Sequence, residues 1–141
     1  MKKLILSLSV MLLVQCLPFA GTNRAYAGGN KPVLEIYYFH GTHRCPTCLS
    51  IEANTRKVLE TYFQDKVDDG TIKLNVLNFQ DKENKALCEK YQVSGSTLLL
   101  VRDVNGDVRT VDLTNYAFSY ARNNPDKYII GLKNRITEML K

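Results

Sequence analysis

The two cysteines of Cys45-Pro46-Thr47-Cys48 have the residue type and spacing best suited to chemistry in this 141-residue chain. They follow an apolar run and begin a stretch of helical periodicity, so Cys45 is predicted to cap a helix, with Pro46 at its first position. Unpaired backbone N–H groups and the positive end of the helix dipole stabilise a thiolate at such a cap. Cys48 is predicted to lie one turn inside the helix, shielded yet close enough to attack a mixed disulfide at Cys45.

Basic and imidazole side chains precede the cysteine pair. His40, His43 and Arg44 are all in the connecting loop, and residues 36–51 contain no carboxylate. This charge distribution favours the thiolate of Cys45. His43 and Arg44 are predicted to be exposed loop residues that act through their charge, and a direct role of His43 in proton transfer is the alternative.

The cysteine pair has two other interpretations. One is a structural disulfide formed on export, although a disulfide that closes so short a loop adds little stability to a chain with an adequate core. The other is a metal site that includes His40 and His43, but the sequence has no second Cys-x-x-Cys motif to complete the ligands. Leu49 follows Cys48 where a c-type haem site needs histidine. We therefore predict no metal and no other cofactor.

Residues 1–27 have the pattern of a secretory signal peptide. A positively charged start precedes the apolar stretch Leu4–Leu17 and the small-residue cleavage site Ala25-Tyr26-Ala27. The apolar stretch is shorter than the roughly 20 residues that span a bilayer, so no stable membrane span is predicted. The protein is expected to be exported to the periplasm. Lipidation of Cys16 is the less favoured alternative, because Gln15 occupies a position where a lipoprotein cleavage site needs a very small residue.

Residues 28–141 are predicted to form a single domain, since no repeat, charge run or linker divides them. The whole chain is 45% hydrophobic and 23% charged, which excludes low-complexity disorder, a collagen-like repeat and a polytopic membrane protein. Removal of residues 1–27 takes away three basic residues and no acid, and the net charge falls from +5 to +2. Nucleic-acid binding is therefore not predicted, and a monomer is expected.

Cys88, on the apolar face of its helix, is predicted to be a buried, inert thiol, with a third redox partner as the alternative.

The periodicity predicts the element order β-α-β-α-β-β-α. Right-handed crossovers then give an α/β fold, with a mixed four-stranded sheet and helices on both faces. Asn105-Gly106 predicts a tight hairpin between the last two strands, because both turn residues need a positive φ. Asp81 is expected to cap the second helix, and Tyr116, Phe118 and Tyr120 to pack over a sheet edge. The predicted strands are 33–39, 72–79, 97–101 and 108–113, and the predicted helices are 46–63, 81–91 and 124–140.

These features together resemble the thioredoxin-like family. The resemblance rests on the strand at 36–39, the motif Cys45-Pro46-Thr47-Cys48, the segment 91–100 and the hairpin after it, and it spans about residues 33–140. It implies a thioredoxin-like fold and thiol–disulfide exchange, with Cys45 as the attacking thiol and Cys48 as the resolving thiol.

Two shorter segments are similar to a narrower group within this family. Tyr38-Phe39-His40-Gly41-Thr42 and Val93-Ser94-Gly95-Ser96 resemble exported bacterial thioredoxin-like proteins labelled as nitrophenyl-compound nitroreductase subunits. The label is not evidence of nitroreduction, since nothing in the sequence indicates a flavin or nicotinamide site.

The sequence departs from the family pattern at three places. Thioredoxins have a cis-proline just before the third strand, where this chain has Ser96 before Thr97. A cis bond without proline costs roughly 3 kcal/mol, so Ser96 is predicted to be trans and the edge that docks substrates to be altered. Arg44 replaces the tryptophan that usually precedes the first cysteine. No carboxylate lies at the family's buried position near Tyr38, so proton transfer to the resolving thiol is expected to use water, Glu35 or a histidine.

The sequence thus predicts an exported thiol–disulfide oxidoreductase that exchanges disulfides with protein thiols or with a redox partner. The alternative is a non-enzymatic thioredoxin-like binding or accessory module with a structural cysteine pair, or a metal-binding variant. The predicted site has Cys45 and Cys48 as catalytic residues and the neighbours His43, Arg44, Pro46, Thr47, Ser96 and Thr97.

Overall fold

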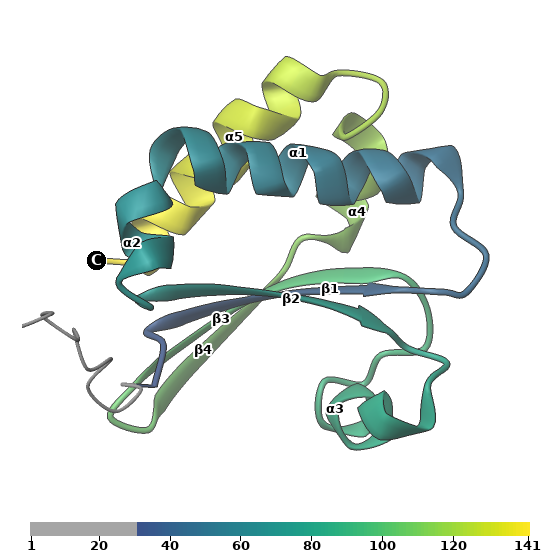
Figure 1. Ribbon diagram of the computed structural model, residues 1–141, viewed down its shortest axis with the longest axis horizontal. Helices are drawn as coiled ribbons and strands as arrows, with labels where there is room; N and C mark the ends of the chain where they lie inside the picture. The colour runs from purple at the N-terminus through teal and green to yellow at the C-terminus, as the bar shows by residue number, and fades with distance from the viewer. Residues whose placement is uncertain (1–30) are drawn as a thin grey trace, which may run out of the picture.

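The computed structural model describes residues 31–141, which form an α/β fold around a mixed sheet of four strands (Figure 1). The predicted signal peptide and Cys16 lie outside the described residues. The strands are β1 (Leu34–His40), β2 (Ile72–Asn78), β3 (Thr97–Val104) and β4 (Asp107–Asp112). The helices are α1 (Pro46–Tyr62), α2 (Gln64–Asp68), η1 (Lys82–Asn84), α3 (Lys85–Lys90), α4 (Thr114–Tyr120) and α5 (Pro125–Met139).

The strand order across the sheet is β2-β1-β3-β4. β1 runs parallel to β2 and antiparallel to β3, and β3 pairs with β4 in an antiparallel hairpin. Asn105 and Gly106 form the hairpin turn with φ angles of 54° and 90°, which confirms the turn predicted from this dipeptide. The sheet is therefore mixed, as predicted, and β1 is one of its two central strands.

β1 is apolar on both faces because each face is covered. Leu34, Ile36 and Tyr38 point into the main core with α1 and α5, and all three are fully buried. Tyr37 and Phe39 point to the opposite face, where they pack in a second cluster with residues of α3 and β3. This alternation accounts for a strand that is almost continuously apolar, as the sequence predicts.

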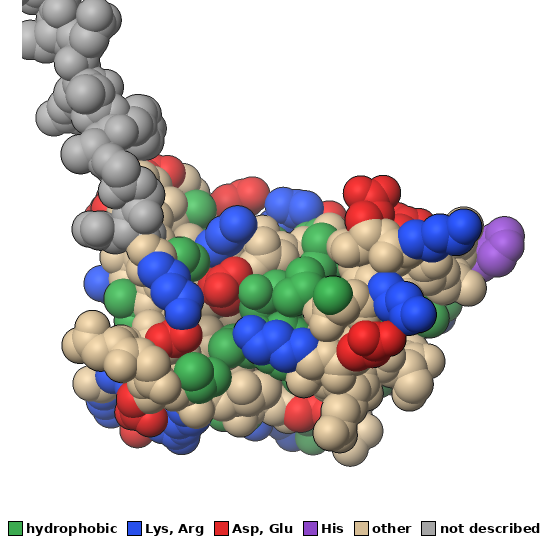
Figure 2. Space-filling model, turned by 90° about the horizontal axis from the view of Figure 1, so that it is seen from below, with side chains coloured by type: hydrophobic (Ala, Val, Ile, Leu, Met, Phe, Trp, Pro, Cys, Tyr) green, Lys and Arg blue, Asp and Glu red, His purple; other side chains and the backbone are tan. Residues whose placement is uncertain are grey.

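The two layers of helices differ in extent. α1, α4 and α5 lie on one face of the sheet, and the short helix α3 lies on the other (Figure 1). On the α3 side, hydrophobic side chains remain visible at the centre of the surface, with charged side chains of both signs around them (Figure 2). The prediction of helices on both faces is confirmed, and most of the core lies between the sheet and α1, α4 and α5.

α2 and α4 are absent from the predicted element order. α4 follows β4 directly, and the four-residue spacing of Leu113, Ala117 and Ala121 buries these three side chains against the core. Small residues allow this close approach, but alanines give a weak hydrophobic pattern. The predicted element order therefore has no helix between the strand at 108–113 and the helix at 124–140, and in this respect it is wrong.

Two predicted local contacts are also wrong. Asp81 does not cap a helix through its side chain; its carboxylate accepts a hydrogen bond from Asn78 Nδ2 at 3.0 Å, and the segment begins as a 3₁₀ turn. Tyr116 packs against α5 and not over a sheet edge, because its hydroxyl donates to the backbone oxygen of Lys127 at 2.7 Å. Gly131 makes room for that hydroxyl, since a Cβ there would lie 2.1 Å from it.

No helix within residues 31–141 is both long and apolar enough to cross a membrane.

Candidate functional site

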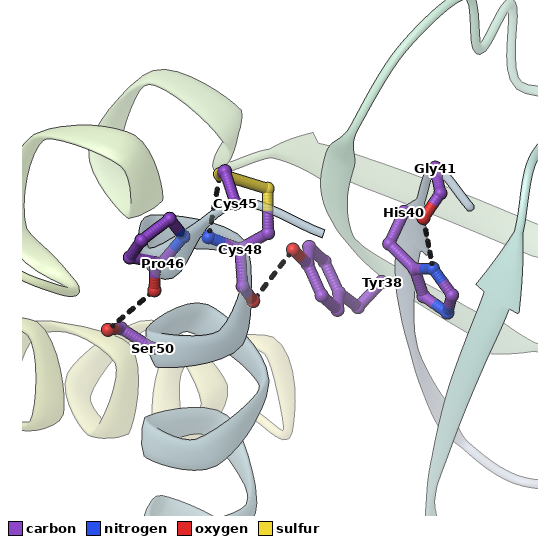
Figure 3. Close-up of a disulfide and its surroundings, with 7 residues drawn as sticks. All are labelled: Tyr38, His40, Gly41, Cys45, Pro46, Cys48 and Ser50. Atoms are coloured by element: carbon purple, nitrogen blue, oxygen red, sulfur yellow. Dashed lines mark hydrogen bonds between the residues drawn. A yellow bond between two sulfur atoms is a disulfide. The ribbon is translucent and has the colours of Figure 1, made fainter. Parts of the chain in front are cut away.

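Cys45 caps the N-terminus of α1, as its position in the sequence predicts. Its backbone is extended, and its Sγ accepts a hydrogen bond from the backbone N–H of Cys48 at 3.1 Å (Figure 3). Pro46 occupies the first turn, where its missing N–H leaves no bond unmade, and the first turn has no acidic residue. A negatively charged sulfur at this cap would be stabilised by the same N–H and by the helix dipole.

The two cysteines form a disulfide, and their exposures differ. Their Cα atoms are 5.0 Å apart across the bond. Cys45 is exposed at the surface, whereas Cys48 is only 6% exposed and faces the core side of α1 with Ile51. Pro46 is exposed and Thr47 is half-buried. An incoming thiol can therefore reach the first sulfur more easily than the second.

Tyr38 connects the central strand to the first turn of α1. Its ring is fully buried, and its hydroxyl donates to the backbone oxygen of Cys48 at 2.9 Å (Figure 3). Burial raises the pKa of this phenol, and the nearby guanidinium of Arg44 partly opposes the rise. The sequence places Tyr38 in the strand but does not predict this bond. The strand's alternation, which turns Tyr38 toward α1, is the only sequence signal for it.

Arg44 is not the exposed loop residue that the sequence predicts. Its side chain is 23% exposed, and its Nη1 lies 2.6 Å from Oε2 of Glu52. Its guanidinium carbon lies 5.7 Å from the centre of the Tyr38 ring. Glu52 also binds Arg56 at 2.7 Å. The positive charge next to the cysteine pair is thus offset by a carboxylate, and Glu52 is a site residue that the sequence analysis missed although it lies one turn after Cys48.

The predicted proton donors separate into two groups. Glu35 lies on the face opposite α1, where its carboxylate accepts hydrogen bonds from Tyr37 at 2.7 Å and Asn75 at 3.0 Å. It cannot serve the thiol of Cys48, so this part of the prediction is wrong. His40 is on the α1 side of the strand, with its ring centre 6.1 Å from that of Tyr38. His43 is exposed in the loop, as predicted.

Ser96 and Thr97 lie at the sheet end from which the cysteine loop departs. Thr97 begins β3 and pairs in register with Phe39, near the end of β1. Its Oγ1 donates to the backbone oxygen of Gly95 at 3.0 Å. The described residues contain no cis peptide bond, so the bond at Ser96 is trans, as predicted. No hydrogen bond within the described part of the chain joins either residue to the cysteine pair.

Metal-ligating residues do not gather around the cysteines. Within residues 31–141, no three or more His, Cys, Asp or Glu side chains lie close enough together to hold a metal ion. The Nδ1 of His40 lies 3.0 Å from the backbone oxygen of Gly41.

The chain was compared with known families, curated proteins and solved structures. No family model matches it, and no curated protein matches it. Among solved structures it is similar to a malarial protein, with 18% identity and a TM-score of 0.39 over 64% of this chain and 94% of that chain. So distant a likeness carries no argument about function. The described geometry shows an α/β protein with a cysteine pair at disulfide distance, which is compatible with redox chemistry.

Proposed function

We propose that this chain is an exported thioredoxin-like oxidoreductase that exchanges disulfides with protein thiols or with a redox partner in the periplasm. The observation that carries the proposal is the asymmetry of the pair: Cys45 is exposed and accepts a backbone N–H at a helix cap, whereas Cys48 is buried. The sheet order, the helices on both faces and the position of the pair after a central strand support the thioredoxin-like fold.

In the proposed reaction, the thiolate of Cys45 attacks one sulfur of a substrate disulfide. A mixed disulfide forms, and the other substrate sulfur leaves as a thiolate and takes a proton from water. Cys48 then loses its proton and attacks Sγ of Cys45. The Cys45–Cys48 disulfide forms and the second substrate thiol leaves, so two electrons have passed from the cysteine pair to the substrate. The same steps in reverse oxidise a substrate dithiol.

The roles of the two cysteines can be tested by trapping. In a Cys88→Ser background, Cys48→Ser should accumulate a mixed disulfide with insulin through Cys45, because no resolving thiol remains. Cys45→Ser should accumulate none, since the remaining thiol is buried. Mass spectrometry of the trapped species identifies the linked cysteine. Equal trapping by the two variants would contradict the assigned roles.

The alternative function, an accessory module with a structural disulfide, gives a different result in turnover. We expect the protein to accelerate the reduction of insulin by dithiothreitol, and the Cys45→Ser variant to fall to the uncatalysed rate. A wild-type protein that gives only the uncatalysed rate would overturn the proposed oxidoreductase function and favour the accessory module.

A further inference from the structure

Charged side chains form a small cluster beside the cysteine pair. Arg44 immediately precedes Cys45, and it reaches along the first turns of α1 to bind Glu52 at 2.6 Å. Glu52 lies four residues after Cys48, so the two share one face of the helix. Tyr38, on β1, lies beside this cluster, and its hydroxyl donates to the backbone oxygen of Cys48. The ion pair therefore spans the turn of helix that carries both sulfurs.

The guanidinium of Arg44 is incompletely satisfied while the disulfide is closed. Its Nε and Nη2 are buried and have no hydrogen-bond partner among the described residues, although Nη1 is bound to Glu52. Buried donors without an acceptor are destabilising, and more so when they are charged. A negative charge that forms nearby when the disulfide opens would offset this cost.

We propose that Arg44 and Glu52 act as opposed positioning residues that set the redox equilibrium of the cysteine pair. The cation favours the reduced form, which carries a thiolate, and the carboxylate limits that effect by holding and partly neutralising the cation. This inference rests on the proposed thiol–disulfide exchange. It assigns to Arg44, at the position of the family's tryptophan, a purpose that a solvated loop residue would not have.

Equilibration with glutathione measures this effect directly. A glutathione thiolate attacks Sγ of Cys45 and the Cys45–Cys48 bond breaks. A second glutathione thiolate then attacks the glutathione sulfur of the mixed disulfide and releases Cys45. Glutathione disulfide forms, and two electrons pass to the protein. A protein sulfur that is released as a thiolate and then becomes a thiol takes its proton from water. The equilibrium constant for the opposite direction, formation of the protein disulfide, should rise when the thiolate is destabilised.

The two variants should shift that constant in opposite directions. Arg44→Met removes the cation and leaves the carboxylate, so we expect the protein disulfide to be favoured by about tenfold over wild type. Glu52→Gln removes the carboxylate and keeps the cation, so the disulfide should be disfavoured by about threefold. Ultraviolet titration of the reduced protein should show the thiol pKa of Cys45 raised in the first variant and lowered in the second.

A matched control and a conservative variant separate charge from structure. Arg56→Met also removes a partner of Glu52, but Arg56 is half-exposed and lies a further turn along α1, so the equilibrium should stay near that of wild type. Arg44→Lys keeps the positive charge but loses the planar guanidinium, so its equilibrium constant should lie between those of Arg44→Met and wild type.

Shifts of the same sign in Arg44→Met and Glu52→Gln, or no shift in either, would overturn the inference. If Arg44→Met does not fold, the neutral variant Arg44→Gln takes its place, and the sign of its shift is compared with that of Glu52→Gln. Failure of this inference is distinguishable from failure of the proposed function, because glutathione equilibrates with the disulfide whether or not the protein reduces insulin. A normal insulin assay with unshifted variants refutes only the role of the ion pair.

Discussion

Cys45 and Cys88 belong to helices on opposite faces of one sheet, and their surroundings differ. Cys45 lies at a helix cap, exposed, with a backbone N–H donated to its sulfur. Cys88 lies inside α3 at 8% exposure, packed in the second cluster with Phe39 and Leu99. Its thiol faces the backbone oxygen of Phe79 at 3.8 Å, an acceptor that cannot stabilise a thiolate.

The difference shows that the position on the helix, more than the residue type, decides reactivity. Burial raises the pKa of the Cys88 thiol, and the neighbouring carboxylate of Glu89 adds to the rise. The cap has the opposite effect, because it supplies an N–H and the positive end of the dipole. Two cysteines of the same domain are thus expected to differ widely in thiolate content at neutral pH.

The largest expected effect is in alkylation. In the reduced native protein, iodoacetamide should modify Cys45 at least about a hundredfold faster than Cys88. The thiol pKa of Cys88 is raised in the folded state, so its rate should go on increasing with pH beyond the ordinary thiol range, where the rate of Cys45 has already levelled off. Peptide mass mapping over time and pH measures both rates. Modification of Cys88 first would contradict the comparison.

The second test concerns the stability that the disulfide adds. Because the bond closes a loop of only a few residues, its reduction should lower the free energy of unfolding by no more than about 2 kcal/mol, and the reduced protein should stay folded. Denaturation with and without dithiothreitol measures the difference. Unfolding of the reduced protein at room temperature would favour the structural interpretation of the pair. The control is the double variant Cys45→Ser with Cys48→Ser, which cannot form this disulfide.

The third test concerns Cys88. Cys88→Ala removes one buried sulfur from a small cluster, so we expect a loss of about 1 kcal/mol in the free energy of unfolding and no change in insulin reduction. Chemical denaturation and the insulin assay provide the two measurements. A Cys88→Ala protein of normal stability that had lost its activity would make Cys88 the third redox partner that the sequence analysis left as an alternative.

The sequence predicts the elements with strong periodicity or distinctive turn residues. The main strands, the helix after Cys45 and the turn at Asn105-Gly106 are confirmed, because alternation, helical spacing and positive φ each have a local signal. α4 was missed, because the side chain that it buries within its bounds is the small Ala117, which gives a weak hydrophobic pattern. The contact of Arg44 with Glu52 was also missed, because it joins a loop to a helix turn through long side chains whose directions no periodicity defines.

The smallest expected effect concerns Ser96, at the start of the strand that pairs with β1. If residues 94–97 form the edge that docks substrates beside Cys45, a proline at this position would make that edge resemble the family pattern. Ser96→Pro should then raise insulin reduction by a few-fold and lower any zinc recovered with the protein, at a cost of roughly 1 kcal/mol in stability, because the native bond is trans. A folded Ser96→Pro protein with wild-type activity and wild-type metal content would place this loop outside the site. The higher reactivity expected of Cys45 than of Cys88 would then depend on the helix cap alone, with no contribution from this loop.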